Sequence, residues 1–170
     1  MSFILAEQRD HDPSDAWWKA YQRYVEQNRG RFPVGALELV TSDWYFNFND
    51  HRCPHDSWLE WTQLRETASN LPNSRRSKTE QRSEGRQSCL TVHLLGAYHD
   101  GYIELHYPIV YSLAFSAPNL TRGLGDWRYD EFRISDTGKL VHEIEWSSFE
   151  GDSTWLIEAS DIQFIWTPHA

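Results

Sequence analysis

The stretch from Cys89 to Val110, CLTVHLLGAYHDGYIELHYPIV, carries three histidines and a glutamate among hydrophobic residues. Asp100-Gly101 within it is the dipeptide typical of a two-residue turn between antiparallel strands. Because side chains alternate between the two faces of a strand, this turn predicts a core face made of Leu90, Val92, Leu94, Tyr98, Ile103, Leu105 and Tyr107. The opposite face is expected to carry His93, His99, Glu104 and His106.

Imidazole and carboxylate groups on one face indicate a candidate metal site. In this register His93 is a diagonal neighbour of His106, and Glu104 lies on the same face. Zinc and other divalent ions accept such ligands but usually need three or four of them. The remaining ligands would come from the segment HRCPHD, which contains His51, Cys53 and His55. The alternative is that the histidines lie on the solvated face of an antiparallel sheet.

A second group of candidate residues is acidic. Asp130 and Glu131 lie in the predicted strand WRYDEFRI, and Glu143 and Glu145 share one face of the predicted strand KLVHEIEW. Paired carboxylates can act as acid and base in glycoside hydrolysis, or they can form an acidic binding surface. The alternative is a solvated acidic face outside an aromatic core. The tryptophans that would stack on a sugar in the first case, and fill the core in the last, are Trp127, Trp146, Trp155 and Trp166.

The net charge and the absence of several well-known motifs argue against particular classes of function. The formal net charge of −9 argues against a nucleic-acid partner, because such binding depends on Lys and Arg that neutralise phosphates. It favours a basic protein partner. The sequence contains no glycine-rich phosphate loop, no GxSxG elbow, and no HExxH or CxxC metal motif, which argues against the common nucleotide-binding and hydrolase classes.

The elements that must position these residues predict one α+β domain. The segment PSDAWWKAYQRYVEQNRGRFP predicts an amphipathic helix over residues 14–29, because Trp and Tyr recur at three- and four-residue spacing. Residues 35–166 predict a twisted antiparallel sheet of six or more strands on which this helix packs, or a half-open barrel. HDSWLEWTQLRE is interpreted as a strand, GALELV and DWYFNF as short strands or loops, and STWLIEA and DIQFIW as strands around a tight turn at Ser160-Asp161.

Two further features of the sequence concern a flexible segment and the cellular compartment. Residues 68–88 are polar, with five basic and two acidic side chains, and predict a flexible basic loop. The N-terminal residues lack the basic region of a secretory signal, and no stretch approaches the roughly 18 apolar residues of a membrane span. Two cysteines, Cys53 and Cys89, give no disulfide framework. We therefore expect a cytoplasmic protein without membrane association.

The succession of HDSWLEWTQLRE, CLTVHLLGAYHDGYIELHYPIVYSLAF and VHEIEWSS with WLIEASDIQFIW resembles small bacterial sheet proteins in which an HDSW-type entry leads into a strand. The likeness covers about residues 50–166, and it implies a sheet protein without implying an activity. From charge, missing motifs and abundant Trp and Tyr, we expect a non-enzymatic protein that binds a basic partner, for example an immunity-type or regulatory protein. The alternatives are a metal-binding protein or metal-dependent hydrolase, and a small-ligand-binding protein.

Overall fold

The computed structural model describes residues 2–12, 14, 16–68 and 86–169. Residues 69–85, which hold most of the predicted basic loop, lie outside the described residues. Three short helices precede a seven-stranded antiparallel sheet, so the predicted α+β architecture is confirmed. The helices are α1 (Ala6–Arg9), α2 (Ala16–Gln27) and α3 (Val34–Thr41). The strands are β1 (Trp58–Ala68), β2 (Arg86–Leu95), β3 (Gly101–Ser116), β4 (Asp126–Ile134), β5 (Leu140–Ser147), β6 (Ser153–Ala159) and β7 (Gln163–Pro168).

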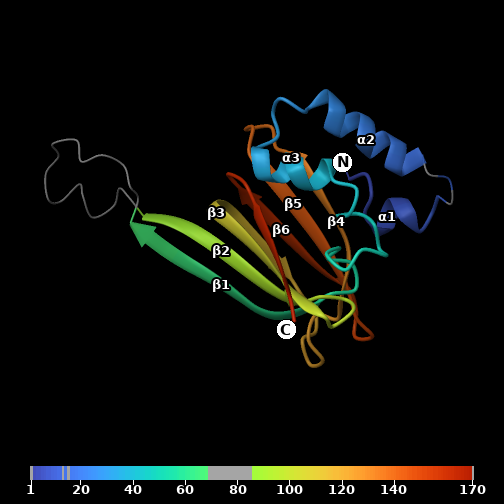
Figure 1. The fold of residues 1–170 in the computed structure, drawn as a ribbon, viewed down its shortest axis with the longest axis vertical. Coiled ribbons are helices and arrows are strands. Elements are labelled where there is room, and N and C mark those ends of the chain that lie inside the picture. Colours follow the sequence, from blue (N-terminus) through green and yellow to red (C-terminus); the bar gives the residue numbers. More distant parts are fainter. Residues whose placement is uncertain (1, 13, 15, 69–85, 170) are drawn as a thin grey trace, which may run out of the picture.

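Six of the strands close into a ring in the order β2-β1-β4-β5-β6-β3, because β2 also pairs with β3. The ring closes where β1 meets β4, with Trp58 opposite Asp126. In Figure 1 the helices lie together on one side of the sheet, while the β1–β2 hairpin projects away from them. None of the helices in the described residues is long and apolar enough to cross a lipid bilayer.

The hydrophobic core lies on the inner side of the strands. Trp127, Trp146 and Trp155 are between 0% and 3% exposed, so they fill the core and their rings are not available to stack on a sugar. Trp166 is partly buried and packs against the edge of the core. Inner and outer side chains alternate along β5 with the period of two that defines a strand.

Helix α2 confirms the helix predicted over residues 14–29, and Tyr21 and Val25 of its aromatic stripe are buried. The expectation that GALELV is a strand or loop is wrong, because this segment forms α3. The Asp161 carboxylate accepts hydrogen bonds from the N–H groups of Gly35 and Ala36 at the start of α3. Such a cap from a distant residue is not visible in the local sequence. The sheet accordingly begins at Trp58 and not near residue 35.

The predicted tight turn at Ser160-Asp161 is also wrong. Ala159 of β6 lies opposite Val110, and Gln163 of β7 lies opposite His106, so both strands pair with β3. They are two halves of one strand that is interrupted at residues 160–162. This interruption is where Asp161 leaves the ladder and caps α3.

The β2–β3 hairpin keeps its predicted faces but not its predicted register. Leu95 replaces His99 as the partner of Tyr102, a shift of four residues. An even shift leaves every strand residue on the face predicted for it, whereas Tyr98, expected in the core, lies in the connection and is 47% exposed. Gly101 is a strand residue, and a Cβ there would lie 2.5 Å from the Trp166 ring. Close packing against Trp166, and not a two-residue turn, therefore requires glycine at this position.

Candidate functional site

The predicted site residues fall on two outer surfaces of the ring and on one inner surface. The outer side of β4 and β5 carries the glutamates at positions 131, 143 and 145, and we call it the covered face. The outer side of β1, β2 and β3 carries Glu60, Trp61, His93, Tyr102 and Glu104, and we call it the open face.

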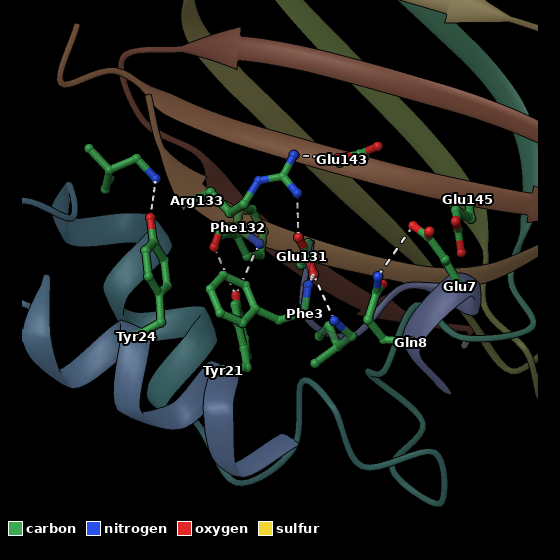
Figure 2. Close-up of polar contacts among 12 residues, drawn as sticks. Phe3, Glu7, Gln8, Tyr21, Tyr24, Glu131, Phe132, Arg133, Glu143 and Glu145 are labelled. Atoms are coloured by element: carbon green, nitrogen blue, oxygen red, sulfur yellow. Dashed lines mark hydrogen bonds and ion pairs between the residues drawn. The ribbon is translucent and has the colours of Figure 1, made fainter. Parts of the chain in front are cut away.

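On the covered face the chain's own N-terminal segment occupies the carboxylates. Glu131 accepts hydrogen bonds from the backbone N–H groups of Phe3 and Ile4, both at 2.8 Å. Glu145 accepts one from the N–H of Ala6 at 2.7 Å, where α1 begins. Figure 2 shows the N-terminal segment lying across β4 and β5 at these side chains. Two of the carboxylates predicted to bind a partner, Glu131 and Glu145, are thus occupied by the protein's own N-terminal segment.

Arg133 offsets part of the negative charge of this face. Its guanidinium binds Glu131 on one side and Glu143 on the other (Figure 2). Glu131 is fully buried, and burial raises its pKa above the ordinary value, although the two backbone N–H groups and Arg133 act in the opposite direction. Burial also raises the pKa of Glu145.

Helix α2 completes the covered face by protecting the edge of β4. The hydroxyl of Tyr21 accepts a hydrogen bond from Phe132 N–H and donates one to Phe132 C=O, both at 3.0 Å. The hydroxyl of Tyr24 accepts one from Ile134 N–H at 2.8 Å. These two side chains, seen pointing from α2 to β4 in Figure 2, satisfy backbone groups that an uncovered edge strand leaves open.

Asp130, the fourth predicted acidic residue, points into the core. Its carboxylate accepts hydrogen bonds from Tyr45 Oη at 2.9 Å and Trp127 Nε1 at 3.0 Å, and it lies 2.9 Å from His142 Nε2. A carboxylate only accepts, so His142 Nε2 donates to Asp130, and His142 Nδ1 lies 2.7 Å from Tyr107 Oη. Because His142 is 0% exposed and Asp130 6%, this buried network specifies the core and does not present groups to a substrate.

The open face places the hairpin histidines beside aromatic rings. His93 lies opposite Trp61 on one side and Glu104 on the other, and its ring stacks on Trp61 with centroids 4.8 Å apart. The Tyr102 ring lies 5.0 Å from it. His93 Nδ1 is 3.3 Å from Glu60 Oε2, yet it makes no hydrogen bond within the described part of the chain. Imidazole, two aromatic rings and two carboxylates therefore share one surface.

A β-bulge on β1 gives the open face its tryptophan. Leu59 lies opposite Leu94 and Trp61 opposite His93, so Glu60 is an extra residue in the ladder. Because of this insertion, Trp58 and Trp61 both point outward, whereas strict alternation would place them on opposite faces. They are 48% and 43% exposed.

The other predicted metal ligands do not join His93 and Glu104. His106 lies beside Thr91, with Nδ1 3.1 Å from the hydroxyl oxygen. His51 stacks on Tyr98 and contacts the Asp100 carboxylate. Among the described residues, no three His, Cys, Asp or Glu side chains come together so as to hold a metal ion.

His55 and Cys53 are engaged elsewhere on their own segment. His55 stacks on Phe48 with centroids 3.7 Å apart, and burial lowers its pKa. Cys53 is buried, and burial raises the pKa of its thiol to about 12. A thiol with such a pKa is a poor metal ligand and a poor nucleophile at neutral pH. The structure thus does not assemble the ligand set of the metal hypothesis in the described residues.

Sequence reasoning missed Glu60 and Trp61, which lie at the centre of the open face. The signal was the ambiguous segment WLEWTQL, in which Trp58, Trp61 and Leu64 fit a helix although the segment also fits a two-sided strand. A bulge is one way to reconcile such a pattern with a strand.

No protein-family model, no curated protein and no solved structure matches this chain. The chemistry of the open face is therefore the starting point for its function.

Proposed function

We propose that the chain is a non-enzymatic binding protein whose open face engages a basic protein partner. The observation that carries this proposal is the exposed Trp61, which stacks on His93, with Glu60 next to it on β1 and Glu104 on the far side of His93 on β3. A protein that neutralises a toxin by binding it, as immunity proteins do, is one instance of this class.

Aromatic side chains on the open face suit an interface anchor. Tryptophan and tyrosine are enriched among the residues that dominate binding energies, and both occur here. The Trp61 ring is held in place by stacking on His93, so little side-chain entropy is lost when a partner covers it. Trp61 is exposed and Tyr102 is partly buried beside the same histidine, so a partner that covers Trp61 would also reach the Tyr102 ring.

Charge determines the kind of partner. Glu60 and Glu104 lie next to the Trp61 and Tyr102 rings, and the whole chain carries a net charge of −9. An Arg or Lys side chain of a partner is attracted both by the carboxylates and by the faces of the aromatic rings. The open face therefore suits a partner that presents a cationic side chain surrounded by apolar contacts.

The test begins with affinity capture from a lysate of the source organism, followed by purification of the captured protein and measurement of its Kd. We expect Trp61→Ala to weaken binding by about tenfold or more. The double variant Glu60→Gln/Glu104→Gln should weaken binding more at low salt than at high salt, because salt screens exposed charges.

Matched control variants are available on other parts of the surface. Tyr111 is 47% exposed, close to the 43% of Trp61, and lies outside the open face, so Tyr111→Ala should leave the Kd unchanged. A partner that binds Trp61→Ala and the wild type equally well would exclude the open face as the interface.

A further inference from the structure

A groove opens at the seam where β1 meets β4. It lies between the first residues of β1, the loop that precedes β4 and the loop that joins β5 to β6, and its volume is about 620 Å³. Pockets that bind small ligands typically have volumes of about 300–1,000 Å³. The groove exists because β1 and β4 touch at Trp58 and Asp126 and then diverge.

Two aromatic rings line the groove and remain exposed. Trp58 is 48% exposed and Phe149 is 102% exposed. The indole N–H of Trp58 donates a hydrogen bond to Asp126 Oδ1 at 2.6 Å. This bond fixes the orientation of the Trp58 ring before any ligand arrives, which lowers the entropy lost on binding. Leu59 and Leu124 add apolar surface to the groove.

The polar groups of the groove are of both signs and are held in position. Arg122 forms an ion pair with Glu150 at 3.6 Å, and Asp126 is bound by Trp58. The hydroxyl of Ser147 donates to Asp152 at 2.9 Å. Because Arg122 is already paired with Glu150, it attracts an anion weakly, and Asp126 disfavours one. The groove therefore favours a neutral ligand with hydroxyl groups over an anion.

The loop before β4 is built to lie close to the end of β5. Gly125 has φ +83°, and a Cβ there would lie 2.0 Å from the Ser147 carbonyl oxygen. Gly123 has φ +78° and also lines the groove. These conformations are readily adopted by glycine, and they keep the backbone of this loop as a wall of the groove.

We propose that this groove binds a neutral sugar, a mono- or disaccharide. The faces of Trp58 and Phe149 provide apolar surface on which the C–H side of a sugar ring packs. Asp126, Arg122 and the serine hydroxyls provide acceptors and donors for the sugar hydroxyls. The site is separate from the open face, because Glu60, Trp61, His93, Tyr102 and Glu104 do not line it. Its occupation therefore does not depend on a protein partner.

The experiment is saturation-transfer NMR on the full chain with maltose, cellobiose and lactose at about 10 mM, a concentration suited to weak ligands. Indole serves as a planar aromatic probe without hydroxyl groups. We expect transfer to at least one sugar, and a Kd that rises about tenfold in Phe149→Ala. Because Phe149 is fully exposed, this variant should fold like the wild type.

Control variants separate the groove from the rest of the surface. Leu120 is 59% exposed in the loop before β4 without lining the groove, so Leu120→Ala should bind the sugar as the wild type does. Transfer to indole without transfer to any sugar would overturn the ligand class. Sugar binding that is equal in wild type and Phe149→Ala would overturn the site.

Discussion

The covered face and the open face are both outer surfaces of the same ring of strands, and both carry carboxylates. On the covered face, Glu131 and Glu145 bind backbone N–H groups of the N-terminal segment, and Arg133 binds Glu131 and Glu143. On the open face, Glu60 lies next to the exposed Trp61, and Glu104 lies opposite His93, on which Trp61 stacks. The same residue type thus stabilises the fold where the chain covers it and is available to a partner where it does not.

The largest loss of stability is expected when the buried Glu131 carboxylate of the covered face is removed. Glu131→Ala removes the acceptor of the Phe3 and Ile4 N–H groups and one of the two carboxylates that bind Arg133. Breaking a buried ion pair by removing one partner costs about 3–5 kcal/mol, so the free energy of unfolding should fall by about 3 kcal/mol or more. Urea unfolding measures it. A loss below about 1 kcal/mol would mean that the segment is not held by Glu131.

A smaller effect is expected where helix α2 protects β4. Tyr21→Phe removes a buried hydroxyl that bonds both backbone groups of Phe132, and we expect a loss of about 2 kcal/mol. Tyr24→Phe is the matched control, because its hydroxyl is partly buried and bonds one N–H, and it should cost about 1 kcal/mol. Thermal and urea unfolding of both variants would settle the order. The reverse order would contradict the role given to Tyr21.

The pH dependence of stability tests the role of Glu131 on the covered face. Burial raises the pKa of Glu131 above 4.5 in the folded state, so the folded state binds more protons than the unfolded state just above pH 4.5. The contribution of Glu131 is therefore fully present below pH 4.5 and is lost as pH rises through the raised pKa. Glu145, whose pKa burial also raises, and His55, whose pKa burial lowers, titrate in wild type and variant alike. We therefore expect the difference in the free energy of unfolding between wild type and Glu131→Gln to fall with rising pH in this window.

Asp50 on the segment before β1 titrates below this pH window. Arg52 holds the pKa of Asp50 at about 2, below its ordinary value of 3.8. The stability that Asp50 contributes is present above pH 3.8 and is lost as pH falls towards 2. A slope above pH 4.5 that is the same in wild type and Glu131→Gln would show that Glu131 is not its source.

The smallest effect on stability is expected on the open face. Trp61 is 43% exposed, so Trp61→Ala should change the free energy of unfolding by less than about 1 kcal/mol. Circular dichroism during urea unfolding gives this value. A loss as large as that of Glu131→Ala would indicate that Trp61 supports the fold and would weaken its assignment to an interface.

The sequence predicted which face of the sheet each strand residue occupies better than it predicted which residue lies opposite on the neighbouring strand. Side-chain alternation placed Leu90 to Leu94 and Ile103 to Tyr107 correctly, because an even register shift leaves faces unchanged. The Asp100-Gly101 turn was wrong because glycine at 101 accommodates the Trp166 ring, a contact between residues far apart in the chain. Helix α3 was missed for a similar reason, since its N-terminal cap is Asp161.

The candidate site was predictable only in part. Alternation placed Glu143 and Glu145 on one outer face, as observed, but it could not show that backbone N–H groups of residues 3–6 reach this face. The bulge at Glu60, which turns Trp61 outward beside His93, depends on the pairing with β2. Both features arise from tertiary packing, which local periodicity does not encode.

The side-chain indole signals of the nine tryptophans test the difference between the two faces most directly. In a ¹H–¹⁵N spectrum titrated with the purified basic partner, we predict that the Trp61 indole signal shifts. The signals of Trp17 and Trp18, which lie on α2 at the covered side, should stay in place. A shift at Trp17 and Trp18 with an unchanged Trp61 signal would contradict the assignment of the open face as the binding surface.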